Sequence, residues 1–455
     1  MPYTMNTALI KKYNIPSPRY TSYPTVPYWK NDEFDKAEHF SRLVSSFKKD
    51  KKEGISVYIH LPYCESLCTY CGCNKRITIN HTVEKPYIDA VLKEWRMYVE
   101  VLGEKPKLAE LHLGGGTPTF FSPENLGKMM DGILEHAIAD EKSQFSFEAH
   151  PNNTTYEHLK VLREKGFNRL SLGIQDFDPV VQSTINRRQS FVQVRKVTQE
   201  ARALGYRSIN FDLIYGLPKQ KMEGLLDTFD KVSVLNPDRI AFYSYAHVPW
   251  KSPSQRGYDE SDLPSEIEKI ELYNTGREKL LETGYVEIGM DHFAKPNEAL
   301  TLAAQNGSIH RNFMGYTTSR NDTLIGLGVS AISDAWSSLA QNPVVVEAYL
   351  EWIEKGELPL VKGHLHSERD LEIRKTILDL MCHFSCQLNY LRNREELETI
   401  VSRLSEHLSD DLLEIGDEGI SVKPEGRAFI RTICMALDEF VWSKEPGKQM
   451  FSRSV

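Results

Sequence analysis

The sequence of 455 residues lacks the features that carry a chain into or across a membrane. No uninterrupted apolar run reaches the roughly 18 residues that a membrane-spanning helix needs, so we expect no membrane span. The first residues, Met-Pro-Tyr-Thr-Met-Asn, contain no basic stretch followed by an apolar one, so we expect no secretory signal. The formal net charge of -8 argues against a broad phosphate-binding surface, and we expect no nucleic-acid partner.

The sequence also lacks the cysteine pattern of a disulfide-stabilised protein. Its 7 cysteines are odd in number, and four of them lie between positions 64 and 73. This pattern favours a reducing compartment, and the cytoplasm is the expected location. Cys382 and Cys386 have helical i,i+4 spacing, which leaves a second metal site conceivable. Because free cysteine is among the most buried residue types, we favour core packing for both, and for Cys434.

Six strand-like runs alternate with amphipathic segments after residue 50. The predicted strands are Ser56–Leu61, Leu108–Leu113, Gln144–Ala149, Asn168–Gly173, Ser208–Ile214 and Arg239–Tyr245. The predicted helices between them are Val83–Leu102, Glu124–His136, Tyr156–Lys165, Val192–Leu204 and Met222–Leu235. This alternation predicts an α/β fold with a parallel sheet and helices packed outside, as a full barrel, an open six-unit barrel or a doubly wound sheet. No Gly-x-Gly-x-x-Gly turn opens the first unit, which disfavours a dinucleotide-binding fold.

Distinctive polar or cysteine residues follow the end of nearly every predicted strand. The cysteine loop follows the first strand, Gly114–Thr119 follows the second, and Glu148 ends the third. Gln175 and Asp176 follow the fourth strand, Asp212 lies inside the fifth, and Ser244–His247 ends the sixth. Because βα barrels build their active sites at the C-terminal ends of the strands, the sequence predicts a site there.

The two ends of the chain differ from this central region. We predict an N-terminal arm and helix over residues 1–53, with the helix near Phe34–Phe47, and a catalytic domain over residues 54–344. Residues 345–455 should form a mostly helical domain with helices at Arg369–His383, Arg394–His407 and Pro424–Trp442 and a hairpin at Leu413–Val422. This order resembles a winged-helix module, but without a basic stripe we favour packing or lid duty over DNA binding.

The spacing of the cysteines in the first loop is the most informative motif. Cys64, Cys68 and Cys71 form a C-x3-C-x2-C triplet, and Cys73 follows. Soft thiolates at short spacing suit iron–sulfur or zinc ligation, but structural zinc sites usually pair two separated knuckles. Three thiolates leave one iron of a four-iron cluster open. The triplet matches the signature of radical SAM enzymes, in which S-adenosylmethionine (SAM) chelates that iron; zinc and an electron-transfer cluster stay as alternatives.

Several other residues carry a chemical argument of their own. Gly114–Gly116 allow close approach of the backbone to a ligand. Glu148 and Asp212 lie in half-buried strands, where an unpaired carboxylate is costly, so a ribose or an amino group should meet them. The guanidinium of Arg187 suits a methionine carboxylate. Tyr58 and Tyr70 flank the cysteines and could shield the cluster or contact adenine, and His292 is the histidine best placed for chemistry.

Taken together, the motifs resemble the oxygen-independent coproporphyrinogen III oxidases, radical SAM enzymes of haem biosynthesis. The resemblance runs from Tyr13 to the last residues. It rests on the segments Pro18–Thr25 (PRYTSYPT), Cys71–Lys75 (CGCNK), Gly114–Thr119, Ile214–Gln220 (IYGLPKQ), Gly289–Ala294 (GMDHFA), His310–Phe313 (HRNF) and Gly328–Ser333. Related haem chaperones usually lack the cysteine at position 73 and the arm motif. The resemblance implies an open, partial TIM-like βα barrel of the radical SAM type.

The resemblance also implies roles for individual residues. Cys64, Cys68 and Cys71 would ligate a [4Fe–4S] cluster, with Cys73 nearby, and the family binds two SAM molecules. Tyr58, Gly115, Glu148 and Ile332 would contact the SAM on the cluster, as would the backbone of Tyr70. The second SAM would contact Gly116, Thr117, Gln175, Arg187, Asp212 and Ala246. One departure is Met314, which stands where the family commonly has glutamine near the second SAM.

The implied reaction converts coproporphyrinogen III to protoporphyrinogen IX by oxidative decarboxylation of the ring A and ring B propionates to vinyl groups. A 5′-deoxyadenosyl radical from SAM would start it, with an unidentified one-electron donor and electron acceptor. Arg or Lys clamps should hold the propionates, and Arg19 is the candidate. We expect a monomer. A radical SAM enzyme that modifies haem itself, or a non-catalytic haem chaperone, would share many of these features.

Overall fold

The computed structural model describes residues 7–29, 34–250, 252–389, 391, 393–443 and 451–453. Its centre is a sheet of 12 strands in the order β16-β15-β14-β13-β1-β4-β5-β6-β7-β8-β10-β9. Six neighbouring strands are parallel and match the six predicted ones: β1 (Ile55–Leu61), β4 (Leu108–Gly115), β5 (Gln144–Ala149), β6 (Phe167–Gln175), β7 (Ser208–Tyr215) and β8 (Arg239–Ser244). Within the described residues the sheet stays open, which confirms the partial barrel.

Short strands extend both edges of this parallel centre. On one side β13 (Thr323–Leu327) pairs parallel with β1, and three antiparallel strands follow: β14 (Ile332–Ala335), β15 (Ser338–Gln341) and β16 (Lys362–Leu365). On the other side lie β10 (His292–Ala294) and β9 (Val286–Gly289). The sheet therefore includes β16, a strand beyond residue 344.

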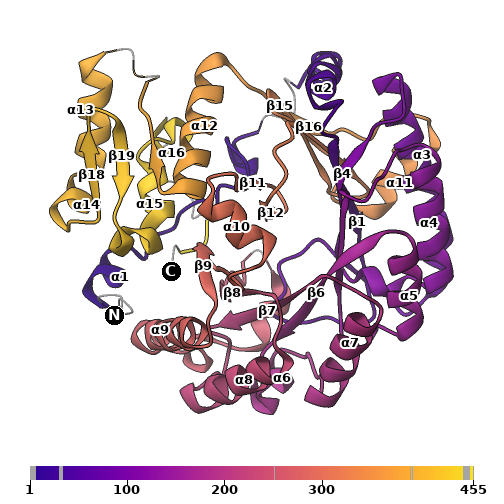
Figure 1. The fold of residues 1–455 in the computed structure, drawn as a ribbon, viewed down its shortest axis with the longest axis horizontal. Coiled ribbons are helices and arrows are strands. Elements are labelled where there is room, and N and C mark those ends of the chain that lie inside the picture. Colours follow the sequence, from indigo (N-terminus) through magenta and orange to yellow (C-terminus); the bar gives the residue numbers. More distant parts are fainter. Residues whose placement is uncertain are drawn as a thin grey trace.

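Helices cover the outer face of the parallel strands (Figure 1). They are α3 (Glu84–Leu102), α4 (Pro123–Glu135), α5 (Tyr156–Glu164), α6 (Pro179–Thr184), α7 (Phe191–Ala203), α8 (Met222–Leu235) and α9 (Glu266–Glu282). The strand β5 shows how the sequence sets the two faces. Its Phe145, Phe147 and Ala149 are buried in the main core, while Gln144, Ser146 and Glu148 alternate with them and face the barrel interior.

The N-terminal arm packs against the C-terminal region and so brings the two ends of the chain together. It contains α1 (Thr7–Tyr13) and leads to α2 (Lys36–Asp50), which begins at its N-cap Asp35 and packs on β14 and β15. The indigo α1 lies next to the yellow C-terminal helices in Figure 1, and the Tyr13 hydroxyl donates to Asp410 at 2.6 Å. In the described residues, no helix is both long enough and apolar enough to cross a membrane.

The C-terminal region is mostly helical, as predicted. It contains α11 (Val346–Glu354), α12 (Glu368–His383), α13 (Arg394–Arg403), α14 (Ser405–Ser409), α15 (Ile430–Met435) and α16 (Glu439–Ser443). The predicted hairpin is formed by β18 (Leu413–Gly416) and β19 (Gly419–Val422), and β17 (Ser385–Cys386) adds a third strand. The remaining elements are β2 (Tyr63–Cys64), β3 (Arg76–Ile77), α10 (Ala299–Gln305), β11 (His310–Asn312), β12 (Gly315–Thr317) and the 3-10 turns Val26–Tyr28, His81–Val83, Pro118–Phe120, Pro253–Gly257, Glu260–Asp262 and Pro424–Phe429.

Two predicted helices are wrong in their extent. The segment Arg394–His407 divides into α13 and α14 at Leu404. The segment Pro424–Trp442 is a 3-10 turn followed by α15 and α16, because Asp438 accepts hydrogen bonds from the Phe440 and Val441 amides and starts a new helix there.

The predicted helix Arg369–His383 is confirmed as α12, and the two nearby cysteines, although spaced i,i+4, lie in different elements. The helix α12 ends at His383, and Phe384 takes a left-handed φ of 57°. Cys382 therefore lies in the helix, whereas Cys386 lies in β17. Both cysteines are buried, as is Cys434, so the prediction of core packing is confirmed.

Candidate active site

The cysteine loop, residues 64–77, leaves the sheet directly after β1. The short parallel ladder of β2 and β3 pairs Tyr63 with Arg76 and Cys64 with Ile77, and so brings the two ends of the loop together. Inside the loop the Cys71 amide donates to the Cys68 carbonyl at 3.2 Å, which turns the chain between the second and third cysteines. The three cysteines of the triplet therefore face one volume.

That volume is a cavity of about 260 Å³ at the C-terminal ends of the strands, which we call the cluster cavity. It brings together eleven of the fourteen residues predicted for the site: Cys64, Cys68, Tyr70, Cys71, Gly115, Gly116, Thr117, Glu148, Gln175, Arg187 and Asp212. Cys73 lines it as well. Among the described residues, no three His, Cys, Asp or Glu side chains are close enough to hold a single metal ion.

The thiols of the triplet have different surroundings. Burial raises the pKa of Cys64 to about 11, although its sulfur lies 3.3 Å from the Thr117 hydroxyl. Hydrogen bonding from the Cys73 thiol lowers the pKa of Cys71, and the Lys75 ammonium acts in the same direction. Since a thiol must lose its proton to bind a metal, positive charge beside the loop favours ligation.

The glycine turn after β4 packs tightly against the start of the cysteine loop. Gly115 has a φ of 114°, a conformation that favours glycine, and its amide donates to Glu148 at 3.2 Å. A Cβ atom on Gly116 would lie 2.5 Å from the Pro62 carbonyl oxygen. The turn therefore requires glycine at both positions, and it places backbone groups on the wall of the cluster cavity.

Arg187 is the buried cation of the cluster cavity. Its Nη2 donates to the Gly173 carbonyl at 2.5 Å and its Nη1 lies 3.6 Å from the Cys68 sulfur. Burial acts to lower the pKa of Arg187, but Tyr70 and Cys68 outweigh it and raise the pKa above its ordinary value. Its buried Nε has no hydrogen-bond partner among the described residues, so the residue has donor capacity left for a ligand.

Asp212 is a half-buried acid on the wall of the same cavity. It accepts hydrogen bonds from Ser171 and Asn210, at 3.0 and 2.9 Å. Burial, with the charge of Glu148 nearby, raises its pKa to about 6. Because desolvation disfavours the charged carboxylate, a hydroxyl or amino group of a ligand would stabilise it.

Three predicted site residues lie outside the lining of the cluster cavity. Tyr58 is buried in β1, stacks on His112 and hydrogen-bonds to His60 at 3.1 Å. Ile332 is buried against Trp29 and Leu339. Ala246 lines another cavity beside β8, and its carbonyl accepts from Gln255.

The cavity also contains residues that the sequence did not single out. His150, Asn153, Gly173 and Tyr243 belong to its wall. His150 and Tyr243 carry a usable signal, because each lies at or just beyond the C-terminal end of a predicted strand. Gly173 carries none in the sequence: its role depends on Arg187, whose Nη2 would lie 2.7 Å from a Cβ at that position.

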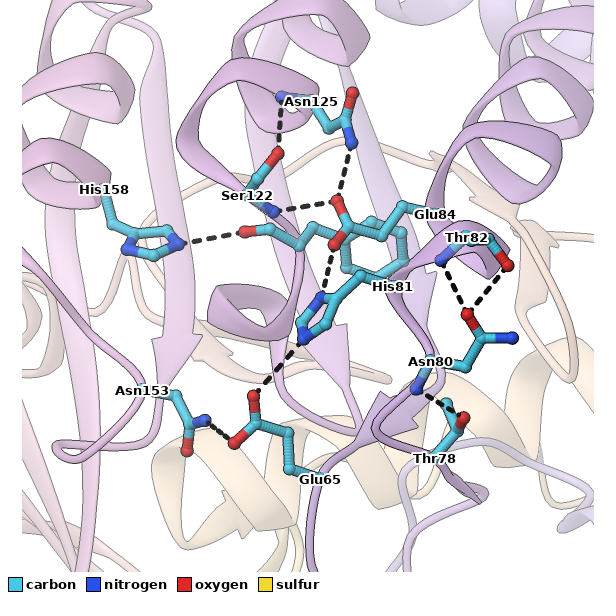
Figure 2. Close-up of polar contacts among 11 residues, drawn as sticks. Glu65, Thr78, Asn80, His81, Thr82, Glu84, Ser122, Asn125, Asn153 and His158 are labelled. Atoms are coloured by element: carbon cyan, nitrogen blue, oxygen red, sulfur yellow. Dashed lines mark hydrogen bonds and ion pairs between the residues drawn. The ribbon is translucent and has the colours of Figure 1, made fainter.

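A polar network supports the cysteine loop from behind (Figure 2). Glu65, next to Cys64, accepts from Asn153 at 2.6 Å, and its other oxygen lies 3.5 Å from His81 Nε2. The other ring nitrogen of His81 is 2.7 Å from Glu84. The buried Glu84 also accepts from the Ser122 amide at 2.9 Å and from the Asn125 side chain. This network joins the cysteine loop to the N-terminal ends of α3 and α4.

Below the cluster cavity, the barrel interior contains a second cavity of about 250 Å³, which we call the lumen cavity. Glu148, Asp212 and Tyr243 line both. Met314 lies in the lumen wall, as does His292, the histidine singled out from the sequence. Burial, together with Arg311, lowers the pKa of His292 to about 4, so its imidazole is neutral near pH 7.

Comparison with known proteins identifies the family. The family model of the Radical SAM superfamily matches residues 58–232 of the chain. The chain is 37% identical to the oxygen-independent coproporphyrinogen III oxidase of Pseudomonas aeruginosa and 36% identical to that of Escherichia coli K12, in each case over 98% of both proteins. The solved structure of the coproporphyrinogen III oxidase HemN from Escherichia coli, a radical SAM enzyme, matches 96% of this chain and 100% of its own, with a TM-score of 0.89 and 34% identity. The chain therefore belongs to the oxygen-independent coproporphyrinogen III oxidases of the radical SAM superfamily.

Proposed function

We propose that the protein catalyses the oxygen-independent oxidative decarboxylation of the ring A and ring B propionates of coproporphyrinogen III, which gives protoporphyrinogen IX. The observation that carries this proposal is the likeness over nearly the whole chain to enzymes of that name, combined with three cysteines of the radical SAM triplet on one cavity. The arm and the C-terminal region are included in the likeness, so it extends beyond the cluster-binding part.

The residues of the cluster cavity fit a [4Fe–4S] cluster and SAM. Three thiolates would bind three irons, and the fourth iron would take the amino and carboxylate groups of the methionine part. Glycine at 115 and 116 keeps side chains away from the wall, and Arg187 Nε is a buried donor with capacity left. When bound, the reduced cluster and SAM supply the radical that removes a hydrogen atom from the propionate β-carbon.

Within this site the chain's own residues bind and orient the reactants. Arg187, 3.6 Å from the Cys68 sulfur, offsets the negative charge of the thiolates and offers Nε to a carboxylate. Glu148, held by the Gly115 amide at one oxygen and 3.5 Å from His112 Nε2 at the other, has acceptor capacity left for a hydroxyl or ammonium group. Asp212, half-buried and hydrogen-bonded on both oxygens, provides a second acceptor for a ribose.

We propose that a second SAM molecule binds beside the first. The adjoining cluster and lumen cavities, which share Glu148, Asp212 and Tyr243, support this proposal. In this protein Met314 contributes a thioether to the lumen wall in place of an amide, so it would make an apolar contact there. We still predict that the protein is a cytoplasmic monomer that uses an external electron donor and acceptor.

The test is an anaerobic assay of the purified protein reconstituted with iron and sulfide. Reductant, SAM, coproporphyrinogen III and a cell extract as electron acceptor are added, and porphyrin products are followed by mass. Loss of two CO2 units with matching formation of 5′-deoxyadenosine is the expected result. Methyl transfer from SAM to a porphyrin would favour a haem-modifying enzyme. Tight haem binding without SAM cleavage would favour a chaperone and contradict the proposal.

A further inference from the structure

A third cavity lies near the strand ends, separate from the cluster cavity and larger than it. It has a volume of about 710 Å³ and lies beside the C-terminal end of β8, and we call it the arm cavity. Its wall combines aromatic and cationic side chains: Tyr245, Trp250, Tyr258, Arg19, Arg256, Lys269 and Arg453. Both kinds of side chain suit an aromatic or pyrrolic ligand that carries carboxylates.

Cations from four distant segments of the chain converge on one end of this cavity. Burial, together with the positive charges of Arg453 and Arg19, lowers the pKa of Lys269 to about 8. Arg431, behind the wall, has its pKa lowered to about 9 by burial and by Arg19. Since burial and neighbouring positive charges lower the pKa of both Lys269 and Arg431, these two cations lie in a poorly solvated region in which an anion would bind favourably.

Two carboxylates accompany these four cations. Asp291 accepts from Arg19 at 3.1 Å, and Glu266 pairs with Arg453. Arg256, Asp259 and Glu260 also line the cavity, so this region holds five cations and four carboxylates and keeps one excess positive charge. Such an excess in a desolvated wall is costly unless an anionic ligand compensates it.

The positions of Arg19 and Arg453 are fixed by backbone contacts. Arg431 Nε donates to the Pro18 carbonyl and its Nη1 to the Arg453 carbonyl, each at 3.1 Å. The Ser17 amide donates to the Ser452 carbonyl at 3.0 Å. Arg431 thus holds the arm and residues 452–453 together, which leaves the Arg19 and Arg453 side chains directed to the cavity wall.

The walls of the arm cavity and the cluster cavity also contact each other. The Arg19 guanidinium lies 5.9 Å from the ring centre of Tyr243, a residue of the cluster-cavity wall. Ser254 donates to the Thr69 carbonyl and Gln255 to the Tyr70 carbonyl, each at 3.1 Å. The loop that forms one wall of the arm cavity therefore supports the cysteine loop, and a large ligand could occupy the arm cavity with one edge near the cluster.

We propose that the arm cavity binds the carboxylates of the tetrapyrrole that are not reacting, with Arg19, Lys269 and Arg453 as their partners. This inference rests on the proposed function. A substrate with four propionates, of which one reacts at a time, needs anchors for the others. The guanidinium groups offer paired donors to a carboxylate, the lysine adds a point charge, and the aromatic wall contacts the macrocycle.

The experiment measures binding of coproporphyrin III, the stable oxidised form of the substrate, to the anaerobically reconstituted holoenzyme by fluorescence titration. Its tetramethyl ester, which has no carboxylates, is the control ligand. Lys269→Met keeps the aliphatic stem and removes the charge, Lys269→Arg keeps the charge, and Arg453→Gln removes a charge from a half-exposed side chain. Lys221→Met is the matched control, since Lys221 is an exposed lysine paired with Glu268 outside the cavity.

We expect Lys269→Met and Arg453→Gln each to weaken coproporphyrin III binding, and to raise KM for coproporphyrinogen III, about 10-fold or more. SAM binding and ester binding should not change, and Lys269→Arg should retain most of the affinity. Wild-type affinity in both charge-removing variants would overturn the inference. The proposed function would still stand in that case, provided that the wild-type enzyme decarboxylates its substrate. A wild-type enzyme that neither decarboxylates nor binds the porphyrin would overturn both, whereas Lys269-dependent binding without decarboxylation would support the cavity and refute only the proposed activity.

Discussion

Replacing Gly116 by alanine should weaken SAM binding without removing the cluster. A Cβ at this position would lie 2.5 Å from the Pro62 oxygen, 2.6 Å from the Pro62 carbonyl carbon and 2.9 Å from the Tyr63 oxygen. These are backbone atoms at the start of the cysteine loop, so no side chain can rotate away. The φ of Gly116 is not positive, and the substitution therefore tests space alone.

The magnitude follows from the cost of inserting a methyl group where no space exists. Overpacking of this kind costs about 1–3 kcal/mol. The free protein can relieve the overlap if the glycine turn moves away from Pro62. Because SAM binding needs the turn in its original position, the cost appears as a loss of affinity of roughly 5- to 150-fold.

The assay is equilibrium dialysis of labelled SAM against the reconstituted protein, with the visible absorbance of the cluster as a check on its content. Gly416→Ala is the control, because a Cβ on Gly416 would meet no atom within 4 Å, and its φ is not positive. The control should bind SAM like the wild type. Unchanged SAM affinity in Gly116→Ala would refute the steric reasoning, and loss of the cluster would show that the turn supports the cysteine loop itself.

Three other changes test the electrostatics and the supports of the site. Cys64→Ala should abolish the cluster spectrum and turnover together, whereas Cys382→Ala, a buried cysteine in α12, should retain both; an intact spectrum in the first variant would remove Cys64 from the ligand set. Glu84→Ala should lower the free energy of unfolding by about 1–3 kcal/mol, because the Ser122 amide and the Asn125 side chain lose their acceptor; thermal unfolding beside the exposed control Glu124→Ala checks this. Burial raises the pKa of Glu94 from 4.5 to about 7, so the folded state holds this proton more tightly. The stabilisation from the protonated Glu94 is therefore complete below the unfolded pKa of 4.5. About 3 kcal/mol of the free energy of unfolding is lost as the pH rises from there through about 7. Glu94→Gln should remove this pH dependence in urea unfolding, and parallel curves for the two proteins would contradict the assignment.

Much of the fold can be predicted from local patterns in the sequence. In β5, apolar residues at 145, 147 and 149 alternate with polar ones, and this alternation alone places Glu148 in the barrel interior. The C-terminal ends of parallel strands meet at one edge, so residues far apart in the chain, such as Cys64 and Asp212, could be predicted to line one cavity. Local periodicity and strand direction sufficed for these conclusions.

Other features depend on contacts that no local pattern contains. The edge strands β14, β15 and β16 have four residues each, and no amphipathic helix separates β14 from β15, so the sequence shows no periodic signal for them. The helix predicted over residues 424–442 has suitable periodicity, but the Asp438 side chain caps a new helix. The arm cavity combines Arg19, Lys269 and Arg453, and only the folded chain brings these residues together.

The arm has a consequence for the order in which the molecule can be completed during synthesis. Its side chains and carbonyls contact residues made hundreds of positions later: Tyr13 contacts Asp410, Tyr20 contacts Asp438, and the Tyr23 carbonyl accepts from His366. The arm leaves the ribosome before these partners and is therefore among the last segments to find its place. We hypothesise that the barrel strands pair while the arm is still undocked; protease resistance of the arm in ribosome-bound chains that end before residue 366 would contradict this order.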